Sequence, residues 1–285
     1  MDTAFQTLAR RDGTLIPVPL MPSSSGPAPE AFEAPCCGQR ITGEAVTVLG
    51  TRTLWRWHYC ACMHEAMALA EEKRAQTEAA REQAALWVER QTAIGRHFPQ
   101  WGQSAKVPRQ TLESFRVTPQ NRAVWERVRA WAEQPRSVGF VLMGPVGTGK
   151  SHMVRGVGHR FLARRQTVLY ASIPYLLERL RSASTAEVSE ILTLHGRADL
   201  VIWDDLGRER PTDWTRDRLY LLLDARYEAE QPLIATANGS PSQLEERWGS
   251  RMVSRLLEMA AIWEVAGGDY RLQTAQQRLR EASGV

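Results

Sequence analysis

The chain has 285 residues, with 36 basic and 32 acidic side chains, a formal net charge of +4 and 43% hydrophobic residues. This length allows one or two domains, and the composition excludes wholesale disorder, a collagen-like chain and a protein with apolar membrane spans. The small net charge gives little support for a strongly basic nucleic-acid-binding domain. Only three of the 36 basic residues are lysines, Lys73, Lys106 and Lys150, so the position of each is informative.

The first 35 residues are rich in Pro, Ser and Gly, and we expect residues 1–35 to form a poorly ordered leader. Their apolar stretch, residues 15–21, is short and contains two prolines, which argues against an export signal. We therefore expect a cytoplasmic protein with no membrane partner.

Residues 36–62 are predicted to form a small cysteine-rich module, with a β-like segment over residues 41–57 between two tight pairs of cysteines. The four cysteines are Cys36, Cys37, Cys60 and Cys62. Such pairs in a protein of intracellular type favour a closed tetrahedral Zn²⁺ site over disulfides, and a metal would stabilise a module with little core. Because the spacing is irregular for zinc, two alternatives stay open. His58 or His64 would replace one cysteine, or the thiols are buried or reactive without a metal.

Residues 63–94 are predicted to be a connecting helix, since residues 63–92 are rich in Ala, Glu, Arg and Gln and contain no Gly or Pro. This helix is either a spacer or an arm that binds a partner. A turn-rich bridge over residues 95–119 follows it.

Residues 95–285 are predicted to form one α/β domain. A helix is expected over residues 121–134, and short apolar strands are expected at residues 140–143, 167–170, 200–203 and 233–236, separated by helical patterns. Fully apolar strands that alternate with helices predict a parallel sheet covered on both faces.

The segment from Gly144 to Ser151 fits the pattern G-x-x-x-x-G-K-[ST] at every required position. Its residues are Gly144, Pro145, Val146, Gly147, Thr148, Gly149, Lys150 and Ser151. It follows a predicted strand and begins a predicted helix, which is the context in which this motif binds nucleotide phosphates. Backbone N–H groups of the loop would surround the phosphates, Lys150 would supply a positive charge, and Ser151 would offer a hydroxyl to Mg²⁺.

Two carboxylates end the third predicted strand. We expect Asp204 to hold Mg²⁺ together with Ser151, and Asp205 to act as general base on the attacking water. The next strand ends near Asn238, which would orient water beside the γ-phosphate or simply form a turn.

Arginines recur after this strand. Arg247, Arg251 and Arg255 are spaced i, i+4, i+8 and are expected on one helical face. This face is either a solvated basic surface or presents an arginine to the nucleotide of a neighbouring subunit. Arg271, after Asp269 and Tyr270, is a further candidate for contact with the phosphates.

Together these motifs resemble the AAA+ ATPases of the DnaC/DnaI helicase-loader group, of which the IstB transposition helpers are close relatives. The resemblance covers residues 95–275 and includes the lead-in at residues 112–121, the phosphate loop, and residues 204–205, 236–238, 250–256 and 269–271. It implies a P-loop AAA+ core with a parallel sheet, preceded by the cysteine-rich module and the connecting helix.

The resemblance also implies roles for single residues. Lys150 and Ser151 would be the Walker A residues, Asp204 the magnesium-associated Walker B acid, Asp205 the catalytic base, Asn238 sensor 1, Arg255 or else Arg251 the arginine finger, and Arg271 sensor 2. AAA+ proteins generally have Glu at the position of Asp205. The shorter Asp reaches about one methylene less far, so hydrolysis is expected to be slow or to need stimulation by DNA or a partner.

The function that this resemblance implies is an ATP-dependent loader that places a replicative hexameric helicase on DNA during replication. Its cofactors would be ATP, Mg²⁺ and Zn²⁺, and its partners the helicase, single-stranded DNA and further copies of itself in the ATP-bound state. DnaI-like loaders carry an N-terminal zinc-binding module that docks on the helicase, which supports the zinc interpretation. The alternatives are an IstB-like helper ATPase that acts on a transposase and DNA, and a nucleotide switch that serves only as an adaptor.

Overall fold

The computed structural model describes residues 5–19, 31–34, 36–48, 52–207, 211–270, 272, 275 and 279. Contacts within the chain divide it into two units, Met1–Ala84 and Ala85–Val285, each of which is described by itself. The long helix α1 (Ala61–His97) contributes to both units. No helix in the described part of the chain combines the length and apolar character needed to cross a membrane.

In the first unit, β1 (Phe5–Ala9) and β2 (Leu15–Pro19) form an antiparallel hairpin. Its turn contains Asp12, whose side chain accepts a hydrogen bond from the backbone N–H of Thr14, and Gly13 with φ of +84°. Ile16 and Val18 are buried in the core of this unit. Residues 1–35 were predicted to form a poorly ordered leader, and the hairpin at residues 5–19 differs from this prediction. An Asp-Gly pair between two strands is typical of a hairpin turn, but the Pro and Ser content of the segment favoured disorder.

Two further antiparallel pairs complete the first unit. They are β3 (Phe32–Glu33) with β4 (Arg40–Ile41), and β5 (Gly43–Val48) with β6 (Arg52–Trp57). The small core buries Ile41 and Cys60 against Met63 and Ala66, which lie in the first turns of α1. Residues 71–83 of α1 are all exposed, as expected for a helix without an apolar stripe.

The second unit is built on a five-stranded parallel sheet, which confirms the predicted α/β class. Its strands are β7 (Gly139–Met143), β8 (Val168–Ser172), β9 (Leu200–Leu206), β10 (Leu233–Ala237) and β11 (Ala260–Glu264), in the order β11-β7-β10-β9-β8. The edge strand β11 was not predicted. Its residues 260–263 are all apolar, but the strand begins directly after the last residue of α9, so no turn residue marks its start.

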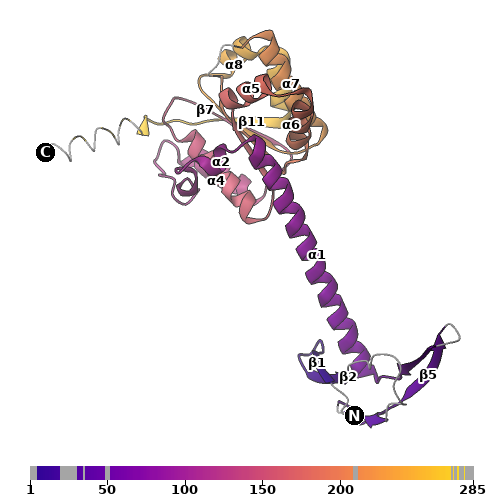
Figure 1. Ribbon diagram of the computed structural model, residues 1–285. Helices are drawn as coiled ribbons and strands as arrows, with labels where there is room; N and C mark the ends of the chain where they lie inside the picture. Colours follow the sequence, from indigo (N-terminus) through magenta and orange to yellow (C-terminus); the bar gives the residue numbers. More distant parts are fainter. Residues whose placement is uncertain are drawn as a thin grey trace. The chain divides into compact units, whose positions relative to one another are not determined.

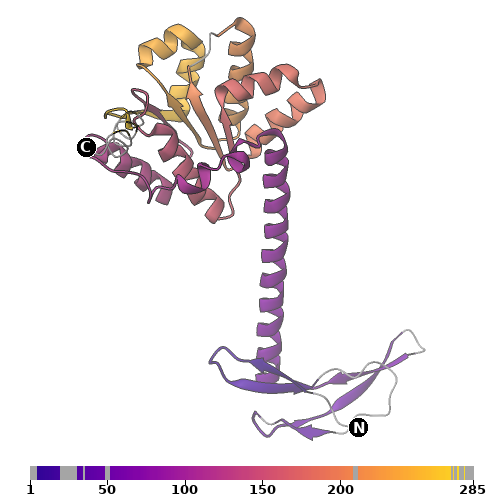
Figure 2. The same cartoon turned by 60° about the vertical axis from the view of Figure 1, so that its left-hand side comes forward.

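Helices cover both faces of this sheet (Figure 1 and Figure 2). They are α2 (Gln100–Gln103), the short 3-10 helix Val107–Arg109, α3 (Arg122–Glu133), α4 (Lys150–Ala163), α5 (Ile173–Ser182), α6 (Thr185–Arg197), α7 (Asp213–Glu228), α8 (Pro241–Trp248) and α9 (Ser250–Met259). Alternate strand residues point to opposite faces. Val201 and Trp203 pack in the layer with α5 to α9, whereas Leu200 and Ile202 pack in the layer with α3 and α4.

This strand order determines where the predicted functional residues meet. Because β10 lies between β7 and β9, the carboxyl ends of these three parallel strands are adjacent. The phosphate loop follows β7, Asp204 and Asp205 lie near the end of β9, and Asn238 follows β10. Ligands of open parallel sheets bind at this edge.

Candidate functional site

The phosphate loop connects β7 to α4 and has a backbone that requires glycine. Gly144, Gly147 and Gly149 have φ of +151°, +80° and +93°. A Cβ atom on Gly144 would lie 2.3 Å from the carbonyl oxygen of Val265, and one on Gly149 would lie 2.6 Å from the ring of Phe115. Both the left-handed backbone and the close neighbours therefore exclude larger residues.

Lys150 is the first residue of α4 and is only 6% exposed. Its Nζ donates hydrogen bonds of 2.7 Å to the carbonyl oxygens of Gly144 and Pro145. The ammonium group is therefore held within the curve of the loop, where backbone N–H groups at a helix N-terminus also attract an anion.

Ser151 and Asp204 are in direct contact, as expected for two residues that share a magnesium ion. The Ser151 hydroxyl donates to Oδ1 of Asp204 at 2.8 Å, and the Thr236 hydroxyl donates to the same oxygen at 2.6 Å. Asp204 is 2% exposed. A donor set made only of hydroxyl and carboxylate oxygens fits Mg²⁺, which prefers oxygen ligands.

Asp205 has an unusual backbone for a residue at a strand end, with φ of +61°. Its N–H donates to the Thr236 hydroxyl at 2.9 Å, so Thr236 connects both aspartates. Asp205 and Asn238 line the same cleft as the phosphate loop. A carboxylate and an amide are thus present beside the loop, where they can contact a water molecule near a terminal phosphate.

The cleft has a volume of about 1090 Å³, which is ample for a nucleotide. Residues of the bridge form part of its wall, among them Gln110, Phe115 and Arg116. Arg116 places its guanidinium carbon 5.8 Å from the ring centroid of Tyr270, which also lines the cleft. Burial lowers the pKa of His152, whose Nε2 lies 2.9 Å from the carbonyl oxygen of Thr111.

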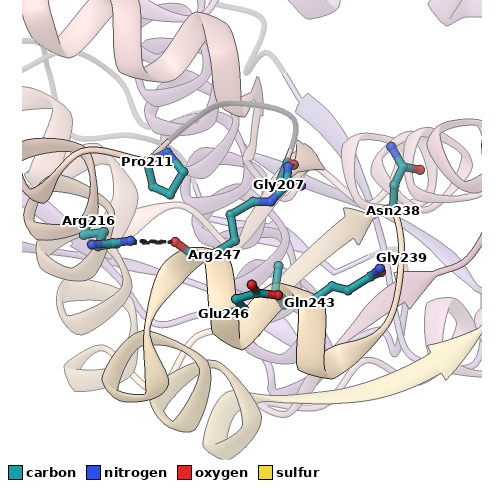
Figure 3. A pocket seen from close by; sticks show the side chains of 9 residues that line it. Gly207, Pro211, Arg216, Asn238, Gly239, Gln243, Glu246 and Arg247 are labelled. Carbon is teal, nitrogen blue, oxygen red and sulfur yellow. Dashed lines mark hydrogen bonds between the residues drawn. The ribbon is translucent and has the colours of Figure 1, made fainter.

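A second cavity, of about 670 Å³, adjoins the cleft at Asn238, which lines both (Figure 3). Arg247 on α8 bonds to the carbonyl oxygen of Gly207 in this cavity, and Arg216 donates to the carbonyl oxygen of Arg247 at 3.1 Å. Arg247 does not share a helical face with Arg251 and Arg255, because Gly249, with φ of +88°, separates α8 from α9. The predicted single face is wrong in this respect.

The two arginine-finger candidates lie on α9 against α7. The Arg255 guanidinium bonds to Asp224 at 3.2 Å and to Glu258 at 3.1 Å, and its carbon lies 3.9 Å from the ring centroid of Tyr227. The guanidinium carbon of Arg251 lies 4.1 Å from the ring centroid of Tyr220. Within the described part of one chain, neither arginine lines the nucleotide cleft. Arg271 lies outside the described residues.

The four cysteines of the first unit converge. Their Sγ atoms all lie within 4.8 Å of one another, with Cys36 and Cys60 at 3.4 Å and Cys36 and Cys37 at 3.8 Å. Tetrahedral Zn²⁺ with Zn–S bonds of about 2.3 Å separates its sulfur ligands by about 3.8 Å, so the geometry fits this metal. Burial raises the pKa of the Cys36 thiol to about 12, a cost that a bound cation would offset by stabilising the thiolate.

The two histidines that were alternative ligands have other neighbours. The Nε2 atom of His58 lies 3.2 Å from Oε2 of Glu44, and the ring of His64 packs edge-on against Tyr59. The four sulfur atoms form a complete ligand set without either imidazole.

Two residues near the cleft were missed by sequence reasoning. Tyr170 on β8 donates a hydrogen bond of 2.6 Å to Oδ2 of Asp204, and Arg155 on α4 lies 3.4 Å from the same oxygen. The sequence could have indicated Arg155, because it lies four residues after Ser151 and therefore on the same face of α4.

Comparison with known proteins supports this interpretation of the core. Residues 60–278 match the model of the IstB-like ATP binding protein family. An ATP-binding protein of an insertion sequence from Geobacillus stearothermophilus is 27% identical over 187 residues, which cover 62% of this chain and 73% of that protein. The chromosomal replication initiator protein DnaA of Citrifermentans bemidjiense is 27% identical over 152 residues, which cover 50% of this chain and only 33% of DnaA.

Among solved structures, the DnaC helicase loader has the same fold, with a TM-score of 0.51 at 19% identity over 57% of this chain and 100% of that one. The parallel sheet, the phosphate loop and these similarities confirm the resemblance to the DnaC/DnaI and IstB group. Because the family model extends over more than half of the sequence, the chain belongs to the IstB-like ATP binding protein family.

Proposed function

We propose that the protein is an ATP-dependent helicase loader that binds a replicative hexameric helicase and places it on DNA in the cytoplasm. The observation that carries the ATP-dependent part is the contact between the Ser151 hydroxyl and the Asp204 carboxylate beside the phosphate loop. This contact brings the two expected magnesium ligands together next to a cleft of sufficient size for ATP.

In this proposal the loop N–H groups and Lys150 bind the β- and γ-phosphates of ATP. Ser151 and Asp204 would hold Mg²⁺, which when bound neutralises charge on the phosphates. Asp205 accepts a proton from the attacking water, and Asn238 orients that water. Because Asp205 is shorter than the Glu usual in AAA+ proteins, we expect slow basal hydrolysis.

The arginine finger would come from a neighbouring copy of the chain. Arg255 and Arg251 lie on α9 and are not among the described residues that line the cleft, so in this proposal they would act on the nucleotide of a second subunit. The proposal therefore includes self-association in the ATP-bound state, with Arg255 as the first candidate and Arg251 as the second. Arg271 is proposed to contact the phosphates as sensor 2.

The first unit is proposed to bind Zn²⁺ through Cys36, Cys37, Cys60 and Cys62 and to dock on the helicase. The support is the convergence of four sulfur atoms that all lie within 4.8 Å of one another, in a unit whose buried core is small. The sequence predicts a module at residues 36–62 and a connecting helix at residues 63–94, and the helix of the structure extends over Ala61–His97. We add the hairpin at residues 5–19 to the proposed module because it shares the same core.

A transposition helper is a second candidate, and two comparisons favour it. The matching family model is IstB-like, and one relative is an ATP-binding protein of an insertion sequence. In that case the partner would be a transposase and the nucleic acid duplex DNA. The cysteine module favours the loader, because the resemblance to DnaI-like loaders includes such a module.

The test is a binding and loading assay with the full-length protein. Equal amounts of purified hexameric helicase and transposase from the same genome are offered to the immobilised protein with ATP, and DNA loading of the helicase is then measured on single-stranded circles. Helicase binding with ATP-dependent loading would support the proposal. Binding of transposase alone would replace the loader by the transposition helper, and turnover unaffected by DNA and by both partners would contradict both.

A further inference from the structure

Two side chains, the buried Tyr170 and the half-buried Arg155, hold the second oxygen of Asp204. The Tyr170 hydroxyl donates to Oδ2 at 2.6 Å, and the nearer terminal guanidinium nitrogen of Arg155 lies 3.4 Å from the same oxygen. Arg155 also donates from Nε to the Tyr170 hydroxyl at 3.1 Å. Tyr170 is 4% exposed. Phosphate binding by the loop does not itself require either side chain, so their contact with this carboxylate needs another explanation.

The Asp204 carboxylate is thereby fixed from both sides. Ser151 and Thr236 donate to Oδ1, while Tyr170 and Arg155 face Oδ2. The Tyr170 hydroxyl serves as a donor to the carboxylate. The charge on Arg155 compensates for burying the carboxylate in a site that water reaches poorly.

Fixing this carboxylate matters because rotation about the Cβ–Cγ bond of an aspartate is soft. A rotation would exchange the oxygen that Ser151 contacts and break the hydrogen bond from Thr236. Thr236 also accepts the N–H of Asp205, so the disturbance would reach the proposed base, whose φ of +61° needs support from its surroundings.

The same network extends to the wall of the cleft. A terminal guanidinium nitrogen of Arg155 donates to Oε1 of Gln110 at 2.6 Å, and Gln110 lines the cleft. Arg155 therefore joins three parts of the site that are distant in sequence, the bridge, the helix after the phosphate loop and strand β9.

We propose that Arg155 and Tyr170 are positioning residues that lock the Asp204 carboxylate so that Oδ1 faces Ser151 and the magnesium ion of a bound nucleotide. The inference rests on the proposed nucleotide site and adds two residues to it. Neither residue is among the described residues that line the cleft. They act on the coupling between metal binding and nucleotide binding.

The test is the ratio between ATP affinity in MgCl₂ and ATP affinity in EDTA, measured by equilibrium binding of fluorescent ATP to the full-length protein. Tyr170→Phe removes one hydroxyl and keeps the ring, whose centroid lies 5.7 Å from that of the Trp101 ring. We expect this variant to lower the ratio about tenfold, as loss of a hydrogen bond to a charged group does, with affinity in EDTA within twofold of wild type. Arg155→Gln should act in the same direction, and Arg155→Lys should recover part of the loss because it keeps the charge.

Matched controls come from α5, which follows β8, and from α4. Tyr175→Phe removes a hydroxyl whose contact is with the carbonyl oxygen of His97 at 3.4 Å, and Arg160→Gln removes a guanidinium of α4 that pairs with Glu113. Both should leave the ratio unchanged. Thermal denaturation of every variant identifies any that fails to fold. If Tyr170→Phe fails to fold, Arg155→Gln gives the same affinity ratio as a test.

The outcomes separate the inference from the function on which it rests. Wild-type protein that binds no ATP in either buffer would overturn both. Magnesium-dependent binding by the wild type, together with an unchanged or higher ratio in Tyr170→Phe and Arg155→Gln, would overturn the inference alone. An equal loss of affinity in EDTA and in MgCl₂ would assign the pair a general structural role and overturn it as well.

Discussion

Ser151, at the start of α4, donates a hydrogen bond of 2.8 Å to Oδ1 of Asp204, 53 residues later on β9. The contact links the loop that follows β7 to a strand that is not its neighbour in the sheet, since β10 lies between them. This hydroxyl and this carboxylate are the proposed ligands of a divalent cation beside the phosphate loop. The predictions on ATP chemistry depend on this arrangement.

Lys150→Ala is expected to reduce ATP affinity by at least about a hundredfold, because no other lysine replaces the charge held by the loop. Isothermal titration with ATP and MgCl₂ measures the loss. Lys73→Ala is the matched control, since Lys73 is exposed on α1, and it should bind ATP like the wild type. Wild-type affinity in Lys150→Ala would contradict the nucleotide site.

Asp205→Asn is expected to bind ATP normally and to lose at least about a hundredfold in turnover, because an amide does not accept the proton of the attacking water. Asp205→Glu, which has one more methylene, should retain measurable turnover. Phosphate release under saturating ATP gives the rates, and fluorescent ATP binding gives the affinities. Undiminished turnover in Asp205→Asn would assign the base to another residue.

Much of the core was predictable because its chemistry lies in contiguous motifs. The glycines from Gly144 to Gly149 signal a phosphate loop by themselves, and the apolar runs of four strands are long enough to predict a parallel sheet. Parallel order then implies that Asp204 and Asn238 lie at the same edge as the loop.

Features that depend on single residues far apart in the sequence were not predictable. Arg155 and Tyr170 meet Asp204 only because α4 and β8 pack beside β9. The spacing of Arg155 from Ser151 places it on the same face of α4 but does not identify Asp204 as its partner, and a lone Tyr gives no pattern. The edge strand β11 follows α9 without an intervening residue, so no turn signal separates the strand from the helix. Gly249 ends α8 through its positive φ, whereas the i, i+4 spacing of the arginines suggested one continuous helix.

The protein is expected to contain about one zinc ion per chain, and Cys60→Ser should lose it, because Cys60 is the most buried of the four ligands. Metal analysis by plasma mass spectrometry of the full-length protein measures the content. His58→Ala and His64→Ala are the controls and should retain the metal, since the four sulfur atoms complete the site. Zinc-free wild-type protein would contradict the site, and loss of zinc in a histidine variant would revise the ligand set.

Stability is expected to fall below pH 6.5 because of His195. This residue is fully buried, its Nδ1 lies 3.0 Å from the carbonyl oxygen of Ile191, and burial lowers its pKa to about 3. In the unfolded chain the imidazole takes up a proton below about pH 6.5, whereas in the folded state it stays neutral until about pH 3. The unfolded state therefore binds more protons in this window, and the free energy of unfolding decreases as the pH falls.

The expected loss is about 1.4 kcal/mol for each pH unit below 6.5, or about 2 kcal/mol at pH 5. His195→Phe should remove this part of the acid slope, because a phenyl ring packs beside Phe98 without taking up a proton. Urea unfolding followed by tryptophan fluorescence, at pH 7.5 and pH 5, compares the slope of the variant with that of the wild type. His58→Ala, at an exposed position, is the control and should keep the wild-type slope. Identical slopes in wild type and His195→Phe would show that His195 does not set the acid sensitivity, whatever the absolute stability of the variant.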